Sequence, residues 1–143
     1  MEIRTAPMKI QLGESEYLLP GFQKIPLSAL SPDSVDWIYV RDHLELSPYT
    51  GDFLEEFRVL KNGGRIDLLV PDTFRILSAR KELPPTEVCK RFYGEKNEIR
   101  STMWLEELST DLFKAGFSNI GGVVGPLLHI CAYKFYVEES QEA

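Results

Sequence analysis

The sequence predicts an α/β fold, a three-layer sandwich whose mostly parallel sheet ends in an antiparallel C-terminal edge. Residues 65–71, "RIDLLVP", form a near-continuous apolar run, which is typical of a strand covered on both faces. The order strand (35–42), helix (52–64), strand (65–71) is that of a right-handed crossover unit. Two final strands, 118–125 and 126–139, are separated only by "GP" and end the chain as a hairpin.

Each element carries its own local signal. The apolar stretch that begins at Lys9 is strand-like and ends at Gly13, and the segment at 35–42 is rich in β-branched and aromatic residues. The helix predicted over 84–94 begins with prolines and stops at a glycine, as helices often do. The helix predicted over 103–117 places a stripe of apolar residues on one face, followed by Gly116. The stripe consists of Leu105, Leu108, Leu112 and Phe113.

Composition limits the function classes. The 143 residues fit one domain, residues 1–143, and 43% hydrophobic with 27% charged residues is ordinary for a globular protein. The net charge of −6 argues against a nucleic-acid partner, because phosphate neutralisation needs clustered Lys and Arg. No stretch approaches the roughly 20 apolar residues of a membrane span, and the first ten residues lack an apolar run of signal-peptide length. We therefore expect no membrane partner and a cytoplasmic location.

Several chemically active side chains have structural interpretations. Cys89 and Cys131 lie in different segments and are expected as buried small apolar residues, with neither a disulfide nor a zinc site. His129 alternates with apolar neighbours, which favours a sheet-face histidine over a ligand, and we expect no metal site. His43 follows Asp42, and the pair is interpreted as a solvated loop although it could do acid–base work. Five aromatic residues are expected in the core rather than on a base-stacking platform: Trp37, Tyr39, Trp104, Phe113 and Phe135.

One long segment resembles a known family. Residues 31–72, "SPDSVDWIYVRDHLEL…FLEEFRVLKNGGRIDLLVPD", are similar to the class I S-adenosylmethionine-dependent methyltransferases of the small-molecule and sugar type. Residues 57–65 match the family's helix, glycine turn and fifth strand, with Asn62 in place of a proline. Residues 91–94 and 104–120 resemble the segments that follow. The resemblance implies a Rossmann-like sheet, here lacking one strand, because nothing between Leu27 and Ser31 corresponds to the third strand.

The resemblance also implies where the cofactor, S-adenosylmethionine, would bind. In the family, a glycine-rich loop after the first strand approaches the cofactor, and an acid ending the second strand binds its ribose. Here Gly13 keeps the loop's first position, Glu14 and Ser15 replace the next two, and Pro26 stands at the place of the acid. The implied cofactor-binding residues also include three acids: Asp33, Asp36 and Asp42.

Two functions remain open on these residues. In the first, the cofactor site is eroded and the domain is a non-catalytic binding or assembly module, which pairs with itself or with an active methyltransferase through the sheet edge that the missing third strand exposes. In the second, the chain is an active methyltransferase that acts on a small or sugar-type acceptor by orienting its substrates, so that no catalytic residue can be assigned. A third interpretation is an unrelated α/β binding protein that shares the "RVLKNGG" block by chance.

Overall fold

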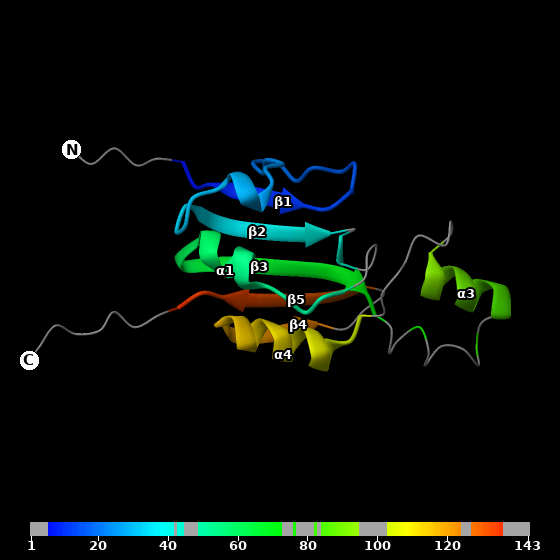
Figure 1. The fold of residues 1–143 in the computed structure, drawn as a ribbon. Coiled ribbons are helices and arrows are strands. Elements are labelled where there is room, and N and C mark those ends of the chain that lie inside the picture. The colour runs from blue at the N-terminus through cyan, green and yellow to red at the C-terminus, as the bar shows by residue number, and fades with distance from the viewer. Residues whose placement is uncertain are drawn as a thin grey trace, which may run out of the picture.

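A single mixed sheet organises the computed structural model (Figure 1). The structure describes residues 6–41, 43–44, 49–72, 76, 82, 84–94, 103–123 and 127–135. The sheet has five strands in the order β1-β2-β3-β5-β4, with β1, β2 and β3 parallel and β5 antiparallel to both β3 and β4. The strands are β1 (Lys9–Leu12), β2 (Val35–Arg41), β3 (Leu60–Pro71), β4 (Ser118–Val123) and β5 (Leu127–Tyr133). The α/β class and the antiparallel C-terminal edge are confirmed.

The missing strand is confirmed by what replaces it. Leu27–Ala29 form a short 3-10 helix, η1, at the place where a third strand would begin. The preceding segment keeps only one bridge to the sheet, since Gln23 pairs with Ile10 in parallel. The Gln11 amide donates to the Gln23 carbonyl at 2.9 Å, and the Gln23 amide donates to the Lys9 carbonyl at 2.9 Å. The second strand implied by the resemblance is thus reduced to a single paired residue beside β1.

Three helices accompany the strands: α1 (Leu54–Val59), α3 (Pro85–Tyr93) and α4 (Leu105–Ala115). Acids fill the first turn of α1 and α4, where they face the positive end of the helix dipole. Gly94 and Gly116 follow α3 and α4 at positive φ, and Gly116 adopts the left-handed conformation expected of a helix-ending glycine. Both α1 and α4 lie in front of the sheet in Figure 1, whereas α3 stands away from it.

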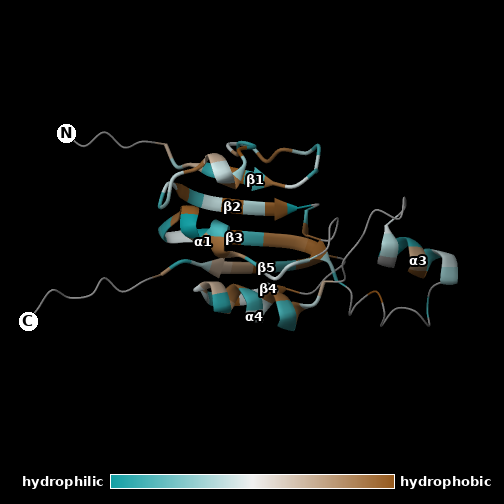
Figure 2. Cartoon of the chain, viewed as in Figure 1, coloured by the Kyte–Doolittle hydropathy of each residue, from teal (hydrophilic) through white to brown (hydrophobic). Residues whose placement is uncertain are grey.

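One face of the sheet carries the core. Buried apolar side chains from β1, β2, β3 and β5 alternate onto this face and meet Phe53, Leu108 and Leu112 from the α1 and α4 segments. Figure 2 shows the hydrophobic colour concentrated along the carboxyl-terminal half of β3, the central strand. The fully buried strand residues in this cluster are Ile10, Val35, Ile38, Leu60, Ile66, Leu68, Leu128, Ile130 and Ala132.

The opposite face of the sheet carries polar and aromatic side chains in place of an apolar core. The register places Trp37 beside Arg65 and Arg65 beside Tyr133, and these side chains point away from the core cluster. Over β1 and β2 this face is covered by Phe22, whose ring packs edge-on against Trp37 at a centroid distance of 5.3 Å. Over the other strands no helix of the described residues lies on it. The second helical layer of the predicted sandwich is therefore not found in the described part of the chain, because a loop occupies the stretch between β1 and Gln23.

The turn from α1 into β3 explains the "NGG" motif. Gly63 has a φ of 85°, which an L-residue with a side chain rarely adopts. At Gly64 a Cβ atom would lie 2.8 Å from the Lys61 carbonyl oxygen and 2.9 Å from the Leu60 side chain. Lys134, just beyond β5, then pairs with this turn through backbone bonds to both glycines. The two glycines thus allow the helix to feed directly into the central strand.

Some burial predictions are wrong. Phe113 is 72% exposed, because Leu108 and Leu112 already turn the packed face of α4 towards the sheet. Phe135 is 50% exposed and stacks on Tyr133 at the uncovered face. Cys89 is exposed on α3 and Cys131 is partly buried, so neither is the buried core residue expected.

Candidate functional site

The carboxyl ends of β1 and β2 enclose a small cavity. In open α/β sheets ligands bind at this edge, where neighbouring connections leave in opposite directions. The cavity has a volume of about 170 Å³, whereas pockets for drug-sized ligands have about 300–1,000 Å³. The described residues that line it are Leu12, Val40, His43, Leu44, Tyr49, Thr50, Asp52, Phe53 and Glu56. Its lining thus mixes apolar walls with two carboxylates, an imidazole and a phenol.

Burial shifts the pKa values of two side chains that line this cavity, Glu56 and Tyr49. Burial raises the pKa of Glu56 to about 7, and the charges of Asp52 and Glu55 add to the rise while a backbone hydrogen bond opposes it. Burial also raises the pKa of Tyr49 above its ordinary value, and so does its hydrogen bond to the Asp111 carboxylate at 2.7 Å. Glu56 can therefore exchange a proton near neutral pH, and Tyr49 stays a hydrogen-bond donor.

The loop after β1 is closed by its own chain. Gln11, 2% exposed, donates through its side-chain amide to the Tyr17 carbonyl at 2.7 Å and accepts from the Leu19 amide at 3.0 Å. Ser15 is buried, and its hydroxyl oxygen accepts from the Tyr17 amide at 3.2 Å. Gly13 provides the positive φ, 118°, at which the chain leaves the strand. The predicted loop residues Gly13 and Ser15 thus belong to an internally bonded turn.

Lys24 reaches the same loop from the remnant of the second strand. Its ammonium donates to the Ser15 carbonyl at 2.6 Å and to the Gly13 carbonyl at 3.4 Å. The resemblance implies a carboxylate that reaches this region from the end of that strand. The structure instead has a cation there, and Pro26 two residues later carries no polar side-chain atom.

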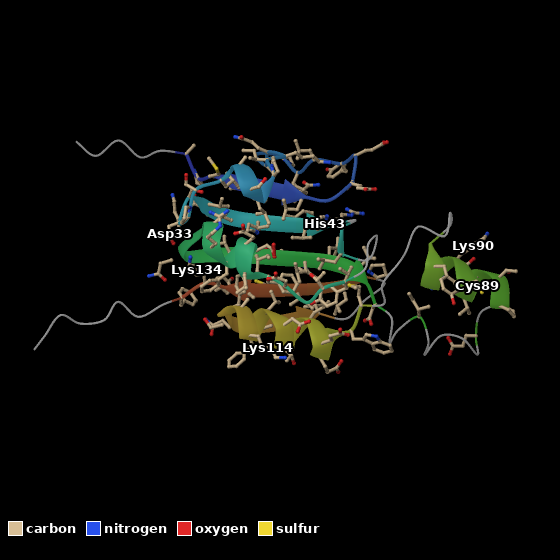
Figure 3. All side chains as sticks on the ribbon, in the orientation of Figure 1. Asp33, His43, Cys89, Lys90, Lys114 and Lys134 are labelled. Atoms are coloured by element: carbon tan, nitrogen blue, oxygen red, sulfur yellow. The ribbon has the colours of Figure 1, made fainter. Side chains whose placement is uncertain are left out.

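The five predicted cofactor-binding residues that the structure describes lie at two opposite ends of the strands. Gly13, Glu14 and Ser15 lie at the carboxyl end of β1, where Glu14 is exposed and none of the three lines the cavity. Asp33 and Asp36 lie at the amino end of β2, a full strand length away, because the parallel register pairs Lys9 with Trp37 and Leu12 with Val40. Figure 3 shows Asp33 at one end of the strands and His43 at the other. Asp42 lies outside the described residues.

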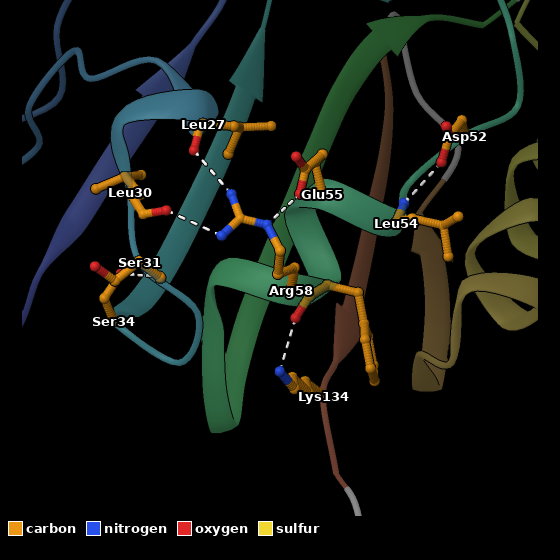
Figure 4. Close-up of polar contacts among 10 residues, drawn as sticks. Leu27, Leu30, Ser31, Ser34, Asp52, Leu54, Glu55, Arg58 and Lys134 are labelled. Carbon is orange, nitrogen blue, oxygen red and sulfur yellow. Dashed lines mark hydrogen bonds and ion pairs between the residues drawn. The ribbon is translucent and has the colours of Figure 1, made fainter.

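Asp33 and Asp36 have structural partners instead. Asp36 accepts from the Met8 amide at 2.7 Å and from Lys61 at 3.4 Å, and Asp33 accepts from the Lys134 ammonium at 3.0 Å. Lys134 also donates to the Phe57 and Leu60 carbonyls, which satisfies the last turn of α1. The close-up in Figure 4 also shows the Arg58 guanidinium, which donates to the Leu27 carbonyl in η1 and to the Leu30 carbonyl just after it.

A second polar cluster, centred on Asp67 in β3, was not predicted from the sequence. The Asp67 carboxylate, 1% exposed in the middle of β3, accepts from Trp37 Nε1 at 2.6 Å and from two Arg65 nitrogens at 2.6 and 2.8 Å. His129 Nε2 lies 2.6 Å from Asp67 Oδ1, as a satisfied sheet-face histidine should. The available signal was the pattern Arg65-x-Asp67 inside an apolar strand, since a buried carboxylate needs donors on its own face.

The described residues contain neither a metal-binding cluster nor a membrane-spanning helix. Among them, no group of three or more His, Cys, Asp or Glu side chains is arranged to hold a metal ion. None of the helices in that part of the chain is long and apolar enough to cross a membrane.

Known structures identify the fold. No protein-family model matches the sequence, and no curated protein matches it. A SAM-dependent methyltransferase of Thermotoga maritima superimposes with a TM-score of 0.58 and 17% identity, over 92% of this chain and 84% of that one. Human N-acetylserotonin methyltransferase, solved with SAM, gives a TM-score of 0.57 and 12% identity, over 91% of this chain and 41% of that one.

The chain has a methyltransferase-like fold. A geranyl diphosphate C-methyltransferase of Streptomyces coelicolor, solved with S-adenosylhomocysteine, extends the likeness, with a TM-score of 0.51 and 12% identity over 79% of this chain. This chain spans 53% of that enzyme and 36% of the S-adenosylmethionine-dependent methyltransferase SibL. It thus shares the methyltransferase architecture but spans only about a third to a half of most of these proteins.

Proposed function

We propose that the protein is a methyltransferase-like domain that does not bind S-adenosylmethionine and does not catalyse methyl transfer on its own. The observation that carries this proposal is the closed loop after β1. Gln11 and Ser15 bond internally to the backbone groups of Tyr17 and to the Leu19 amide, so these groups are not presented to a cofactor. The 170 Å³ cavity beside the loop is smaller than pockets that hold ligands of this size.

Charge at the loop supports the same proposal. S-adenosylmethionine carries a sulfonium cation, and its ribose hydroxyls need hydrogen-bond acceptors. Lys24 brings a cation to the loop and offers only donors. At contact distance two like charges near a protein surface repel by a few kcal/mol. The cofactor would therefore have to displace Lys24 from two carbonyl oxygens before its ribose could be seated.

On this proposal the domain works by assembly, and the partner we favour is a second copy joined through β4. β4 is the outer strand of the sheet and contains no charged residue, so its free backbone groups lack the usual protection against pairing. The opposite edge, which the sequence indicated, is partly blocked by the Gln23 bridge and by Pro26. Sedimentation analysis should give a concentration-dependent dimer, and a strict monomer at high concentration would contradict this assembly.

Calorimetric titration tests the cofactor proposal. We expect no heat and no thermal shift for the purified chain with S-adenosylmethionine or S-adenosylhomocysteine at about 1 mM, with the Thermotoga maritima methyltransferase as the positive control. Micromolar binding with a raised melting temperature would overturn the proposal.

An active enzyme is the second candidate, favoured by the Thermotoga maritima enzyme, of which this chain spans 84%. A domain of nearly this size thus belongs to a SAM-dependent methyltransferase. In this candidate the chain binds the cofactor at the ends of β1 and β2 and methylates a small or sugar-type acceptor. Glu56, with its pKa near 7, would serve as the proton acceptor in the cavity. Cofactor binding in the titration would favour this candidate.

A further inference from the structure

A larger cavity lies on the uncovered face of the sheet. It opens over β3, β5 and β4, has a volume of about 430 Å³, and falls within the range of about 300–1,000 Å³ for small-molecule pockets. Its lining includes the side chains of Arg65, Asn119, His129 and Cys131 and the backbone of Gly121. We call it the sheet-face cavity. It lies away from the strand ends, where the cofactor of the related enzymes was expected.

The two basic side chains of the cavity are held in place from below. Asp67 is buried beneath them and accepts two hydrogen bonds from Arg65, at 2.6 and 2.8 Å. Its Oδ1 atom also lies 2.6 Å from His129 Nε2. Burial raises the pKa of Asp67, but the bonds from Arg65, His129 and Trp37 outweigh burial and lower it below its ordinary value. The carboxylate therefore stays ionised and fixes both the guanidinium and the imidazole.

Aromatic rings complete the support of Arg65. Its guanidinium carbon lies 4.9 Å from the Trp37 ring centroid and 6.0 Å from that of Tyr133, on the two strands that flank β3. Lys9 adds a second cation 5.5 Å from the Trp37 centroid. Arg65 uses Nε and one terminal nitrogen for Asp67, and it remains about one-third exposed. A guanidinium held in this way is preorganised for a ligand on its open side.

The chemistry of the lining selects the ligand. The chain has 22 acidic against 16 basic residues, yet none of the described residues that line the sheet-face cavity is acidic. Guanidinium and amide groups offer hydrogen-bond donors, the His129 ring, whose Nε2 bonds to Asp67, offers a flat surface, and Val123 and the glycine backbone offer apolar surface. Such a lining suits a ligand with an acceptor-rich anionic group beside a flat apolar part.

We propose that the sheet-face cavity binds a small organic anion, a carboxylate or phosphate ester with an apolar or planar body, through the Arg65 guanidinium and beside the His129 ring. This site is independent of the absent methyl-transfer activity proposed above. Cofactor binding at the strand ends would remove that proposal and leave this one standing.

Gly121 allows the site to be closed without disturbing the fold. A Cβ atom at Gly121 would have no other atom within 4 Å, so a side chain there projects into open space. At the neighbouring Gly122 a Cβ atom would lie 2.6 Å from the Leu105 side chain under α4. Gly121→Leu should therefore fill the cavity. Thr110→Leu adds the same side chain to the exposed surface of α4 in the other layer and is the matched control.

The experiment is a heteronuclear NMR titration of the full chain with benzoate, phenyl phosphate and inorganic phosphate, and with benzamide and benzamidinium as neutral and cationic counterparts. We expect the two aromatic anions to shift the amide resonances of Gly121, His129 and Cys131. Binding should weaken at least about tenfold in Gly121→Leu and stay unchanged in Thr110→Leu. Arg65→Lys keeps the charge beside Asp67 but loses the planar fork, and it should weaken the anions selectively.

Each alternative result decides the matter. Equal binding of benzamidinium, shifts confined to other residues, or undiminished binding in Gly121→Leu would overturn the proposal. Shifts by inorganic phosphate alone at the same residues would support the anion subsite and contradict the need for an apolar body. Absence of any shift at about 10 mM probe, well above the Kd of an ordinary fragment, would also overturn it.

Discussion

Lys134 is 5% exposed, and its ammonium is satisfied by three protein oxygens from two segments of the chain. It donates to Asp33 Oδ1 at 3.0 Å and to the Phe57 and Leu60 carbonyls at 2.8 and 2.7 Å, and it lies 4.7 Å from the Phe57 ring centroid. Lys134→Met should cost about 2–3 kcal/mol of unfolding free energy, because the helix-end carbonyls lose their donor. Urea denaturation measures the cost, and Lys114→Met on the exposed end of α4 should change stability by less than about 0.5 kcal/mol.

Glu56 makes a pH-dependent contribution of the opposite sign to that of most carboxylates. Its pKa is about 7 in the folded protein against an ordinary value of 4.5, so the neutral form is favoured on folding. The contribution to stability is complete below pH 4.5 and is lost as the pH rises through about 7. Glu56→Gln should therefore raise the melting temperature near about pH 8 and leave it almost unchanged near about pH 5. A constant difference at both pH values would contradict the burial of this carboxyl.

At the scale of an element, the loop between β1 and Gln23 depends on one buried amide. Gln11→Leu keeps the volume of the side chain but removes the acceptor for the Leu19 amide and the donor for the Tyr17 carbonyl. Hydrogen exchange at Leu19 should accelerate at least about tenfold, the equivalent of one lost hydrogen bond. Gln23→Leu is the matched control, because Gln23 is exposed and bonds to β1 through its backbone. Equal acceleration in both variants would mean that the loop opens with the whole edge.

The elements themselves could be predicted from periodicity. Strands β1 and β2 and helices α3 and α4 follow the predicted stretches within a few residues, because apolar spacing decides them. β5 ends at Tyr133, whereas the predicted strand continued to residue 139, and residues 136–139 lie outside the described part of the chain. The shorter α1 and longer β3 could not be predicted, since the Lys134 backbone turns the "KNGG" segment into an extension of the strand. A partner that lies far away in the sequence leaves no local signal.

The candidate site was predictable only in part, for the same reason. The pattern after β1 indicated an altered loop, but the hydrogen bonds of Gln11 and Lys24 that close it depend on the chain folding back on itself. Asp33 and Asp36 were assigned from a motif, whereas the parallel register places them at the other end of the strand. Asp67 was hidden by its apolar neighbours, and its partners Trp37 and His129 come from other strands.

The stability of the whole molecule at acidic pH depends in part on the ionisation of Asp67. Its pKa is lower in the folded than in the unfolded chain, so the stability it provides is present above pH 3.8 and is lost as the pH falls through the folded value. Asp67→Asn should cost about 2–3 kcal/mol near neutral pH, because Arg65 and His129 lose their counterion but stay partly solvated. It should also make unfolding less steep below about pH 4, and circular dichroism across that range measures both effects. An unchanged acid transition would mean that other carboxylates govern it.

The contacts of Lys134 also constrain the order in which the chain can fold during synthesis. Lys134 and Asp33 are 101 positions apart in the sequence, and β5 must reach β3 before either α1 or its glycine turn is complete. While the ribosome is still adding the C-terminal third, β3 has an open edge and the end of α1 has unsatisfied carbonyls. We therefore expect the nascent chain to be prone to aggregation until β5 has emerged and paired with β3. Release of a chain shortened before Lys134 should leave a sticky intermediate, not a smaller folded domain.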